Sequence, residues 1–365
     1  MNRKQILAVS AGIFSLVTGI FAVRAFWLFP DNAPEAAPPQ MHELRGQDNS
    51  LSGPYSYKNL TVYLIHGGDV LKGKTPLTLE EAMERKLVVV HETEDVNELA
   101  IENVSHKDEV YVQAGDIVKG GKQDRVLAVD LIVPARSGRI PMDSFCVEHG
   151  RWTGRGSELS TRFESSTEYV SSKDMKIAAR HSKSQGQVWN EVERSQDKLS
   201  AATNSNTASS VSMSSLPLTL ENSRVRADSG EYIKALSNIV EGKPDVIGFL
   251  FAINGEINSA DTYGSKALFL KLWPKLLKAA AIEAVAETSD ADTRAEQAET
   301  RPVGSVPQAA LPDIETFLET SENAPMTNER QVTARIKMLT RETKNSVFLE
   351  SLDHTTLLHR SYIAK

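Results

Sequence analysis

The residues with the most unusual chemistry lie in a glycine-containing loop, AGDIVKGGKQDR, at residues 114–125. Gly120 and Gly121 stand between Lys119 and Lys122. The backbone N–H groups of such a turn can point inward and form an anion nest, with ammonium groups beside it. A nest of this kind suits a phosphate or a carboxylate.

The loop is not a Walker A motif. Its glycine spacing is one residue off, and Gln123 stands where that motif has a metal-binding Ser or Thr. A hairpin turn with solvated charges is the second interpretation, and the two are compatible. The ligand-binding candidates of the loop are Lys119, Gly120, Gly121, Lys122, Gln123 and Arg125.

A second polar group contains Cys146, Glu148, His149, Arg151 and Trp152. Cys146 and His149 would face opposite sides of a strand, so we expect a buried cysteine rather than a nucleophile and its base. The other three residues suit a polar contact surface or the end of a sheet.

A third group, Asn258, Asp261 and Tyr263, lies at the predicted junction of a strand and a long helix. An amide, a carboxylate and a phenol there suit a ligand site, although Asp261 or Ser265 can equally cap the helix. Over the whole chain, the candidates for a general acid or base are Asp124, Glu148 and Asp261. Further ligand-binding candidates are Arg151, Asn258 and Tyr263.

Near the C-terminus, His359 and Arg360 can line a site or pair with acidic neighbours. Elsewhere the sequence has no Gly-x-Ser-x-Gly elbow, no Gly-x-Gly-x-x-Gly fingerprint and no His-Glu-x-x-His motif. One cysteine can form neither an internal disulfide nor a cysteine-rich zinc site. We expect no metal and no cofactor, and whether the chain is an enzyme stays open.

Hydropathy patterns predict the elements that position these residues. Strands are expected at residues 58–66, 87–90, 99–104, 110–118, 126–133 and 145–147, with a capping box opening a short helix at Thr78. Helices are expected at 173–199, 222–240 and 265–287, the last kinked or broken by Pro274.

The turn Asn254-Gly255 predicts a hairpin. A short helix is expected at 313–318 and strands at 332–339, 346–352 and 355–363, which either return to the main sheet or form a separate module. We therefore expect an α+β fold, a β-rich core with several flanking helices, plus one N-terminal transmembrane helix.

The N-terminal helix is predicted from an apolar, uncharged stretch at residues 6–23. Crossing a bilayer takes roughly 20 such residues. Arg3 and Lys4 precede the stretch, and the positive-inside bias keeps them in the cytoplasm. A cleaved signal peptide fits less well, because an arginine falls within the cleavage pattern. We expect an uncleaved, single-pass anchor at residues 1–29, in contact with lipid through residues 6–29.

The remaining chain is expected on the periplasmic side of a bacterial cytoplasmic membrane. A Pro-rich tether at residues 30–54 would lead to a single domain at residues 57–365 with a disordered, acidic insertion at 288–310. The net charge of −7 without a dense basic patch argues against nucleic acid as a partner.

Three segments also carry a family resemblance. They are AGDIVKGGKQDRVLAVDLIVPARSG through FCVEHGRW (114–152), GFLFAINGEINSADTYGSKALFLKLWPKLLKAAAIEA (248–284) and LLHRSYIAK (357–365). They resemble a bacterial family of unknown function, the ARG-and-rhodanese-phosphatase-superfamily-associated protein domain. The resemblance implies one domain over residues 57–365. Its name implies a context of nucleotide or phosphate chemistry and no particular mechanism.

Two functions follow as expectations. The first is a membrane-anchored envelope domain that binds a small anionic ligand or a protein partner, since polar clusters fall at loops. The alternative is an anchored hydrolase or transferase for a phosphate- or carboxylate-bearing substrate, nucleotide-related substrates included. In that case Lys119 and Lys122 would hold the anion.

Overall fold

The computed structural model describes residues 40–44, 49–93, 95–155, 162–170, 172–288 and 308–365. The expected membrane anchor at 1–29 and nearly all of the expected insertion at 288–310 lie outside these ranges. Among the residues described, no helix is both long and apolar enough to span a bilayer. Contacts join the chain from residue 39 onward into one unit. This unit has an α+β fold that is rich in β-sheet.

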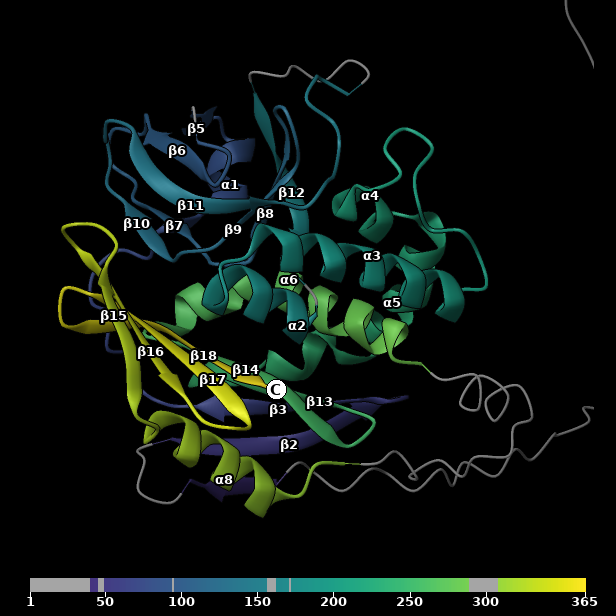
Figure 1. Ribbon diagram of the computed structural model, residues 1–365. Helices are drawn as coiled ribbons and strands as arrows, with labels where there is room; N and C mark the ends of the chain where they lie inside the picture. The colour runs from purple at the N-terminus through teal and green to yellow at the C-terminus, as the bar shows by residue number, and fades with distance from the viewer. Residues whose placement is uncertain (1–39, 45–48, 94, 156–161, 171, 289–307) are drawn as a thin grey trace, which may run out of the picture. The chain divides into compact units, whose positions relative to one another are not determined.

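The largest sheet in the described residues has nine antiparallel strands and interleaves the two ends of the chain with its middle (Figure 1). In spatial order the strands are β1 (Gln40–Glu43), β2 (Ser50–Tyr57), β3 (Leu60–His66), β13 (Val246–Ile253), β14 (Glu256–Tyr263), β18 (Thr356–Ala364), β17 (Ser346–Asp353), β16 (Ile336–Glu342) and β15 (Met326–Gln331). The C-terminal strands therefore return to the main sheet.

The hairpin of this sheet forms as its sequence predicts. β13 and β14 are joined by Asn254 and Gly255, which have φ angles of 55° and 85°. Two positive φ angles characterise the type I′ turn, whose twist matches that of the flanking strands. The hairpin places Asn258, Asp261 and Tyr263 on β14, next to β18.

The N-terminal edge of the sheet changes the expected domain boundary. Residues 40–43 and 50–57 form β1 and β2, and β2 pairs with β3 along its length. Leu51, Ser52 and Gly53 of β2 are buried, and Leu51 is 1% exposed. The described part of the expected tether at 30–54 therefore belongs to the folded unit, because its apolar side chains pack on the sheet despite its Pro- and Ser-rich composition.

Two smaller sheets stand on the other side of the helices. One contains β12 (Phe163–Tyr169), β8 (Asp116–Gly120), β9 (Arg125–Leu127), β11 (Ile140–Cys146), β6 (Glu98–Asn103) and β5 (Val88–Glu92). The other contains β10 (Leu131–Val133), β7 (Val110–Val112) and β4 (Leu77–Thr78), and β4 leads into helix α1 (Leu79–Glu84). The capping box at Thr78 is confirmed, with reciprocal bonds to Glu81.

Two predicted strands are each divided between these sheets. The stretch 110–118 becomes β7 and β8, and the stretch 126–133 becomes β9 and β10. The chain turns at Gly115, which has a φ of 106° and donates its N–H to the carbonyl of Leu127. The buried carboxylate of Asp130 accepts the N–H of Ala114 at the same place. A local turn inside a uniformly apolar run leaves no periodicity signal.

The helices are α2 (Lys173–Lys176), the π-helix η1 (Ile177–His181), α3 (Gln185–Ala202), α4 (Leu216–Leu220), α5 (Ser223–Leu236), the 3₁₀-helix η2 (Ser237–Val240), α6 (Lys266–Ala286) and α8 (Leu311–Glu322). The single helix expected at 173–199 is wrong. Its chain breaks after η1, where Lys183 has a φ of 49°, and α3 restarts with Ser184 as its N-cap.

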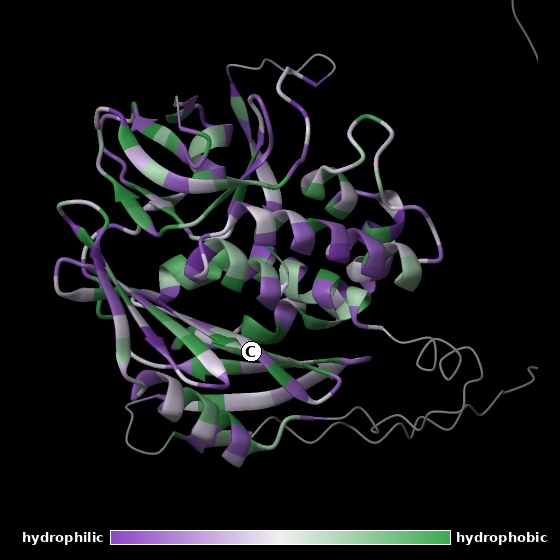
Figure 2. Cartoon of the chain, in the orientation of Figure 1, coloured by the Kyte–Doolittle hydropathy of each residue, from purple (hydrophilic) through white to green (hydrophobic). Residues whose placement is uncertain are grey.

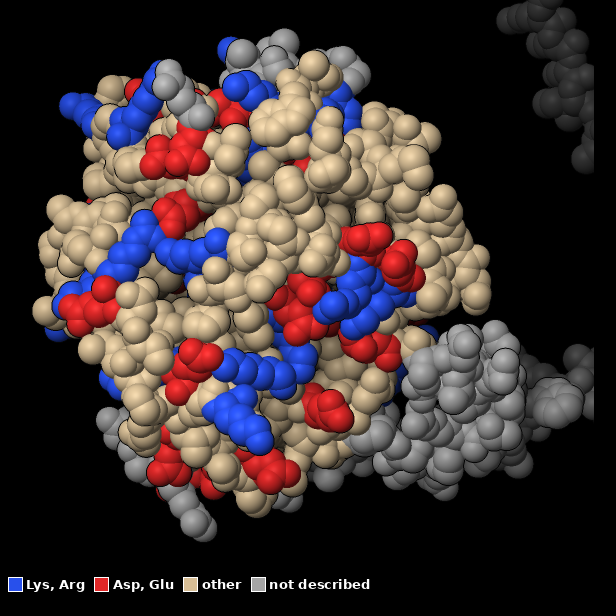
Figure 3. All heavy atoms as spheres, in the orientation of Figure 1, with Lys and Arg blue, Asp and Glu red and all other residues tan. Residues whose placement is uncertain are grey.

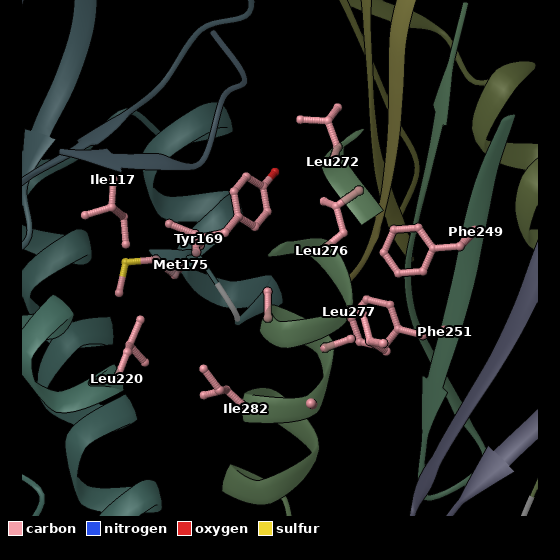
Figure 4. Packing of buried hydrophobic residues seen from close by; sticks show 14 of the residues in the cluster. Ile117, Tyr169, Met175, Leu220, Phe249, Phe251, Leu272, Leu276, Leu277 and Ile282 are labelled. Carbon is pink, nitrogen blue, oxygen red and sulfur yellow. The ribbon is translucent and has the colours of Figure 1, made fainter. Parts of the chain in front are cut away.

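Helix α6 is the centre of the packing. It runs unbroken through Pro274, so of the kink or break expected there the break does not occur, and Ser265 caps its start. Figure 2 shows hydrophobic residues along α6 and mostly hydrophilic ones on α3. In Figure 4, Leu276 and Leu277 of α6 lie beside Phe249 and Phe251 of β13. The other face of the sheet packs on α8.

Candidate functional site

The glycine loop forms an anion nest that the protein's own carboxylates fill. The N–H of Gly120 donates to Asp124 Oδ1 over 2.8 Å, and the N–H of Lys122 donates to Glu92 Oε1 over 2.7 Å. The N–H of Gly121 donates to a backbone carbonyl. The two glycines have φ angles of 99° and 56°, which turn the backbone as the nest requires.

Two other loop candidates, Lys119 and Arg125, also have side-chain partners within the protein. Lys119 Nζ lies 2.6 and 2.7 Å from the two carboxylate oxygens of Glu221. Arg125 is 1% exposed, donates to the carbonyl of Gln123 over 3.0 Å and lies 3.5 Å from Glu92. The amide group of Gln123 is fully buried and has no partner among the described residues.

The second predicted group meets this loop in a cluster of buried ion pairs. Asp124 and Glu148 are both 0% exposed. Arg155 donates to Asp124 Oδ2 over 2.8 Å, and Arg151 Nη2 lies 2.7 Å from Glu148 Oε2. Arg151 also donates to the carbonyls of Gly120 and Gly121. The sequence segments 119–125 and 148–151 are therefore brought together.

The electrostatics of this cluster favour the charged form of Glu148. Burial raises the pKa of Glu148, but hydrogen bonds from Arg151, Ser212 and the backbone N–H of Asp124 outweigh it and lower the pKa. Cys146 nearby is buried, as predicted, and burial raises the pKa of its thiol. A catalytic role for Asp124 or Glu148 stays a prediction.

The third predicted group opens onto a different centre, inside the main sheet. Asp261 of β14 and Asp130 face the two ring nitrogens of His359 from opposite sides, each 3.0 Å away. All three side chains are at most 1% exposed. The Tyr263 ring stacks on the imidazole with centroids 4.7 Å apart. Asp261 does not cap α6, since Ser265 does.

The charges of this centre stabilise one another. Burial lowers the pKa of His359, but the two aspartates outweigh it and raise the pKa. Burial raises the pKa of Asp130 and of Asp261, but His359 and nearby cations outweigh it, leaving Asp130 well below its usual value and Asp261 at about 2. Both ring nitrogens face carboxylate oxygens, which only accept hydrogen bonds when ionised, so the arrangement suits an imidazole with a proton on each nitrogen.

Arg180 of η1 joins this centre to a surface cavity. Its side chain is 3% exposed, and its Nη1 donates to Ser361 Oγ over 3.1 Å. Its Nε and Nη2 have no partner among the described residues. Arg180 also lines a cavity of about 250 Å³ between η1, the edge strand β15 and its neighbour β16, together with Lys183 and Arg330.

A second cavity lies at the other end of the same helical segment. It has a volume of about 310 Å³ and is lined by α2, α3, the β13–β14 hairpin and the end of α6. Asn258 lines it, as does Glu283, which is 4% exposed. Glu283 Oε1 accepts from Asn258 Nδ2 over 2.9 Å and from the N–H of Lys173 over 3.0 Å.

The two cavities are joined by buried polar groups. Ser259 Oγ donates to Asn258 Oδ1 over 3.1 Å, and Lys176 Nζ donates to Ser259 Oγ over the same distance. Burial raises the pKa of Asp261, and the positive charge of Lys176 is one of the effects that oppose burial and lower this pKa. The α2–η1 segment thus carries one buried cation toward each cavity, Lys176 and Arg180.

Three residues of these sites escaped the sequence analysis, namely Asp130, Arg180 and Glu283. Asp130 and Glu283 share one signal, because each is a lone charge within an apolar run, VLAVDLIV and AAAIEAVA, whereas Arg180 lies between Lys176 and His181 in KIAARH and carries no such signal. A lone charge at a core position is rare and is retained where it has a partner. For His359 the sequence left two alternatives open, that it lines a site or that it pairs with acidic neighbours. The structure shows it paired with two aspartates.

Comparison with known proteins adds a family and nothing closer. No curated protein and no solved structure matches the chain. A family model, that of the ARG and Rhodanese-Phosphatase-superfamily-associated Protein domain, matches residues 48–363. That range includes the glycine loop, the buried His359 centre and both cavities, and it begins just before β2. The chain therefore belongs to the family of the ARG and Rhodanese-Phosphatase-superfamily-associated Protein domain.

Proposed function

We propose that this domain binds a small oxyanion, a phosphate or a carboxylate, in the cavity between η1, β15 and β16. The observation that carries the proposal concerns Arg180, a residue of the cavity wall. Its Nε and Nη2 atoms have no hydrogen-bond partner among the described residues. These two N–H groups are the donors with which a guanidinium grips an oxyanion through two parallel hydrogen bonds.

The other side chains of this cavity suit an anion. Lys183 and Arg330 line it with Arg180, and Thr327, Asn328 and Thr340 add hydrogen-bonding groups. Lys183 and Arg330 both contact Asp143, which does not line the cavity. Glu342 is the one acidic residue in the described wall, and it pairs with Lys365 and lies 3.5 Å from His181.

The position of Arg180 in a π-helix supports a ligand site. A π-helix is rare and is found frequently at functional sites. The Nε and Nη2 atoms are buried without a ligand, so binding requires a small shift of the wall. The wide turn of η1 and the exposed edge strand β15 are the elements best able to give way.

Binding is favoured over hydrolysis by the state of the carboxylates. Asp124 and Glu148 are ion-paired with arginines. The pKa of Asp261 lies at about 2, with its Oδ1 on His359. A general acid or base works best with a pKa near the working pH. We also propose that the N-terminal segment holds this binding domain on the outer side of a bacterial membrane.

The test is isothermal titration of the full-length chain with inorganic phosphate, pyrophosphate and citrate. We expect at least one of them to bind, and more weakly as the salt concentration rises. Arg180→Lys keeps the charge but loses the fork, so affinity should fall about tenfold. Lys183→Asn, at an exposed position with positive φ that Asn tolerates, should also weaken binding.

Lys337→Gln is the matched control. Lys337 lies on β16 next to the cavity residue Met338 in sequence, but it does not line the cavity, and its side chain pairs with Glu329 instead. Its loss should leave affinity unchanged. The proposal fails if none of the three anions binds the unmodified chain, or if Arg180→Lys binds as well as the unmodified chain does.

A further inference from the structure

A buried glutamate with one unused oxygen distinguishes the larger cavity. Glu283 Oε2 is buried and has no partner among the described residues, whereas Oε1 accepts two hydrogen bonds. The side chain is 4% exposed and belongs to the cavity wall. An unpaired carboxylate oxygen in a low-dielectric wall is costly, and a donor that reached it would remove this cost.

The charges around the cavity favour a cation as that donor. Its wall contains the acids Asp174, Glu191, Glu256, Glu283 and Glu287 and the bases Lys173, Arg194 and Lys198. Three of the acids already have partners, because Glu191 lies 2.8 Å and Asp174 3.9 Å from Arg194, and Glu287 lies 2.5 Å from Lys198. Acidic groups therefore exceed basic ones, in contrast to the cavity at Arg180.

The cation that fits is organic rather than a metal ion. In the part of the chain that the structure describes, no three His, Cys, Asp or Glu side chains are grouped so as to hold a metal. An ammonium group needs fewer ligands, and this region already accommodates one. Lys176 Nζ donates to Ser259 and lies 5.5 Å from the centre of the Phe251 ring, which is typical of a cation–π contact.

We propose that this cavity binds a small organic amine whose ammonium group donates to Oε2 of Glu283. The Asn258 side chain and the N–H of Lys173 hold the carboxylate in place through Oε1. Glu256, exposed at the start of β14, adds negative charge at the rim. The ligand differs in charge from the oxyanion expected at Arg180, so the two sites are separate.

The protonation of Glu283 agrees with this role. Burial raises the pKa of Glu283, and Lys176 and Asn258 only partly oppose it. The Glu283 carboxyl group on its own therefore resists carrying a negative charge. An ammonium ion beside Oε2 stabilises the charged carboxylate, so amine binding and ionisation support each other.

The experiment is calorimetric titration of the full-length chain with putrescine, and with 1,4-butanediol as a probe of the same length without charge. We expect putrescine to bind and the diol not to. Glu283→Gln keeps the shape and the acceptor for Asn258, and it should weaken putrescine binding at least tenfold. Glu256→Lys changes an exposed residue that cannot disturb the core, and it should weaken binding as well.

Glu329→Gln, an exposed acid on β15 outside this cavity, is the matched control and should bind putrescine unchanged. Thermal melts of each variant show that it is folded. The proposal is overturned if putrescine does not bind the unmodified chain, if the diol binds as well as the diamine, or if Glu283→Gln and Glu256→Lys both retain full affinity.

Discussion

At the scale of single residues, the most consequential groups of this protein are buried charges. His359 lies between two buried aspartates, and Arg180 and Glu283 each have polar atoms beside a cavity that find no partner among the described residues. Removing one partner from a buried charge pair costs more than the pair itself contributes, because the remaining charge stays buried. Substitutions here are therefore expected to act strongly.

His359→Gln should destabilise the fold. The substitution leaves Asp130 and Asp261, each about 1% exposed, without the cation between them. We expect the free energy of unfolding to fall by about 3–5 kcal/mol, measured by urea denaturation. His354→Asn is the control, because His354 is 68% exposed on the turn before β18 and its φ of 55° suits Asn. A loss of equal size in both variants would contradict this account.

The pH dependence of that difference has a defined sign. The pKa of His359 is raised above its usual 6.5, so its contribution is complete below pH 6.5 and is lost as pH rises through the folded value. The pKa values of Asp130 and Asp261 are lowered from 3.8, so their contribution is complete above pH 3.8 and is lost as pH falls.

The stability gap between the unmodified chain and His359→Gln should therefore be largest between pH 3.8 and pH 6.5. It should shrink at higher pH. Denaturant titrations of both proteins over a pH series measure it. A gap that widens above pH 6.5 would show that His359 is not a buried cation.

The sequence predicted which residue types matter better than it predicted their grouping. The loop around Gly120 and the segment at Glu148 meet, while Asp261 and Tyr263 belong to another centre. Asp130, which joins strands far apart in the chain, carried no motif. Groupings that depend on long-range pairing are not written in local spacing, whereas helix caps and the Asn-Gly turn are.

At the scale of elements, local sequence signals predicted a helix or strand reliably where the whole segment packs as a single element in one part of the fold. The helix at 265–287 and its Ser265 cap were predictable, because capping and apolar content are both local. The stretches 110–118 and 126–133 were each predicted as one strand although each forms two, since both halves of each stretch are buried. Burial on all sides removes the alternation from which a strand's ends are read.

Pro274 gives a test at this scale. It lies exposed inside the continuous helix α6 and has no N–H to donate to the carbonyl one turn back. A central proline costs about 3 kcal/mol relative to alanine, partly offset by its effect on the unfolded chain. Pro274→Ala should therefore raise the free energy of unfolding by about 2 kcal/mol.

Pro312→Ala serves as the comparison. Pro312 lies in the first turn of α8, where the N–H is not needed, so its replacement should change stability little. Thermal and urea unfolding of both variants decide the matter. A Pro274→Ala protein less stable than the unmodified chain would mean that α6 depends on a distortion that proline maintains.

The type I′ turn between β13 and β14 gives a second test. Gly255 has a φ of 85°, which an alanine adopts only with strain. Gly255→Ala should lower the free energy of unfolding by about 1–2 kcal/mol. Gly68→Ala is the control, because a Cβ there meets no atom within 4 Å. Equal stability of the two variants in urea denaturation would contradict the assigned turn.

At the scale of the whole molecule, the described unit extends further toward the N-terminus than composition indicated. β2 covers β3, whose seven residues are all buried. A chain that begins at residue 58 exposes that strand as a sheet edge and should aggregate. A chain that begins at residue 39 should melt cooperatively.

Size-exclusion chromatography and circular dichroism of the two truncated chains measure this difference. A soluble chain from residue 58 with a cooperative melt would restore the shorter boundary.

The face in Figure 3 carries interspersed positive and negative side chains rather than a broad field of one sign.

The order of the main sheet also has a consequence in time. β18 lies between β14 and β17 and supplies His359, although β14 ends at Tyr263 and β18 begins only at Thr356. Neither the sheet nor the buried centre can close before β18 has been synthesised. Such late, non-local pairing slows folding and lengthens the period in which an incomplete sheet is exposed. A chain that stops before residue 356 would lack the central cation and the strand that carries it.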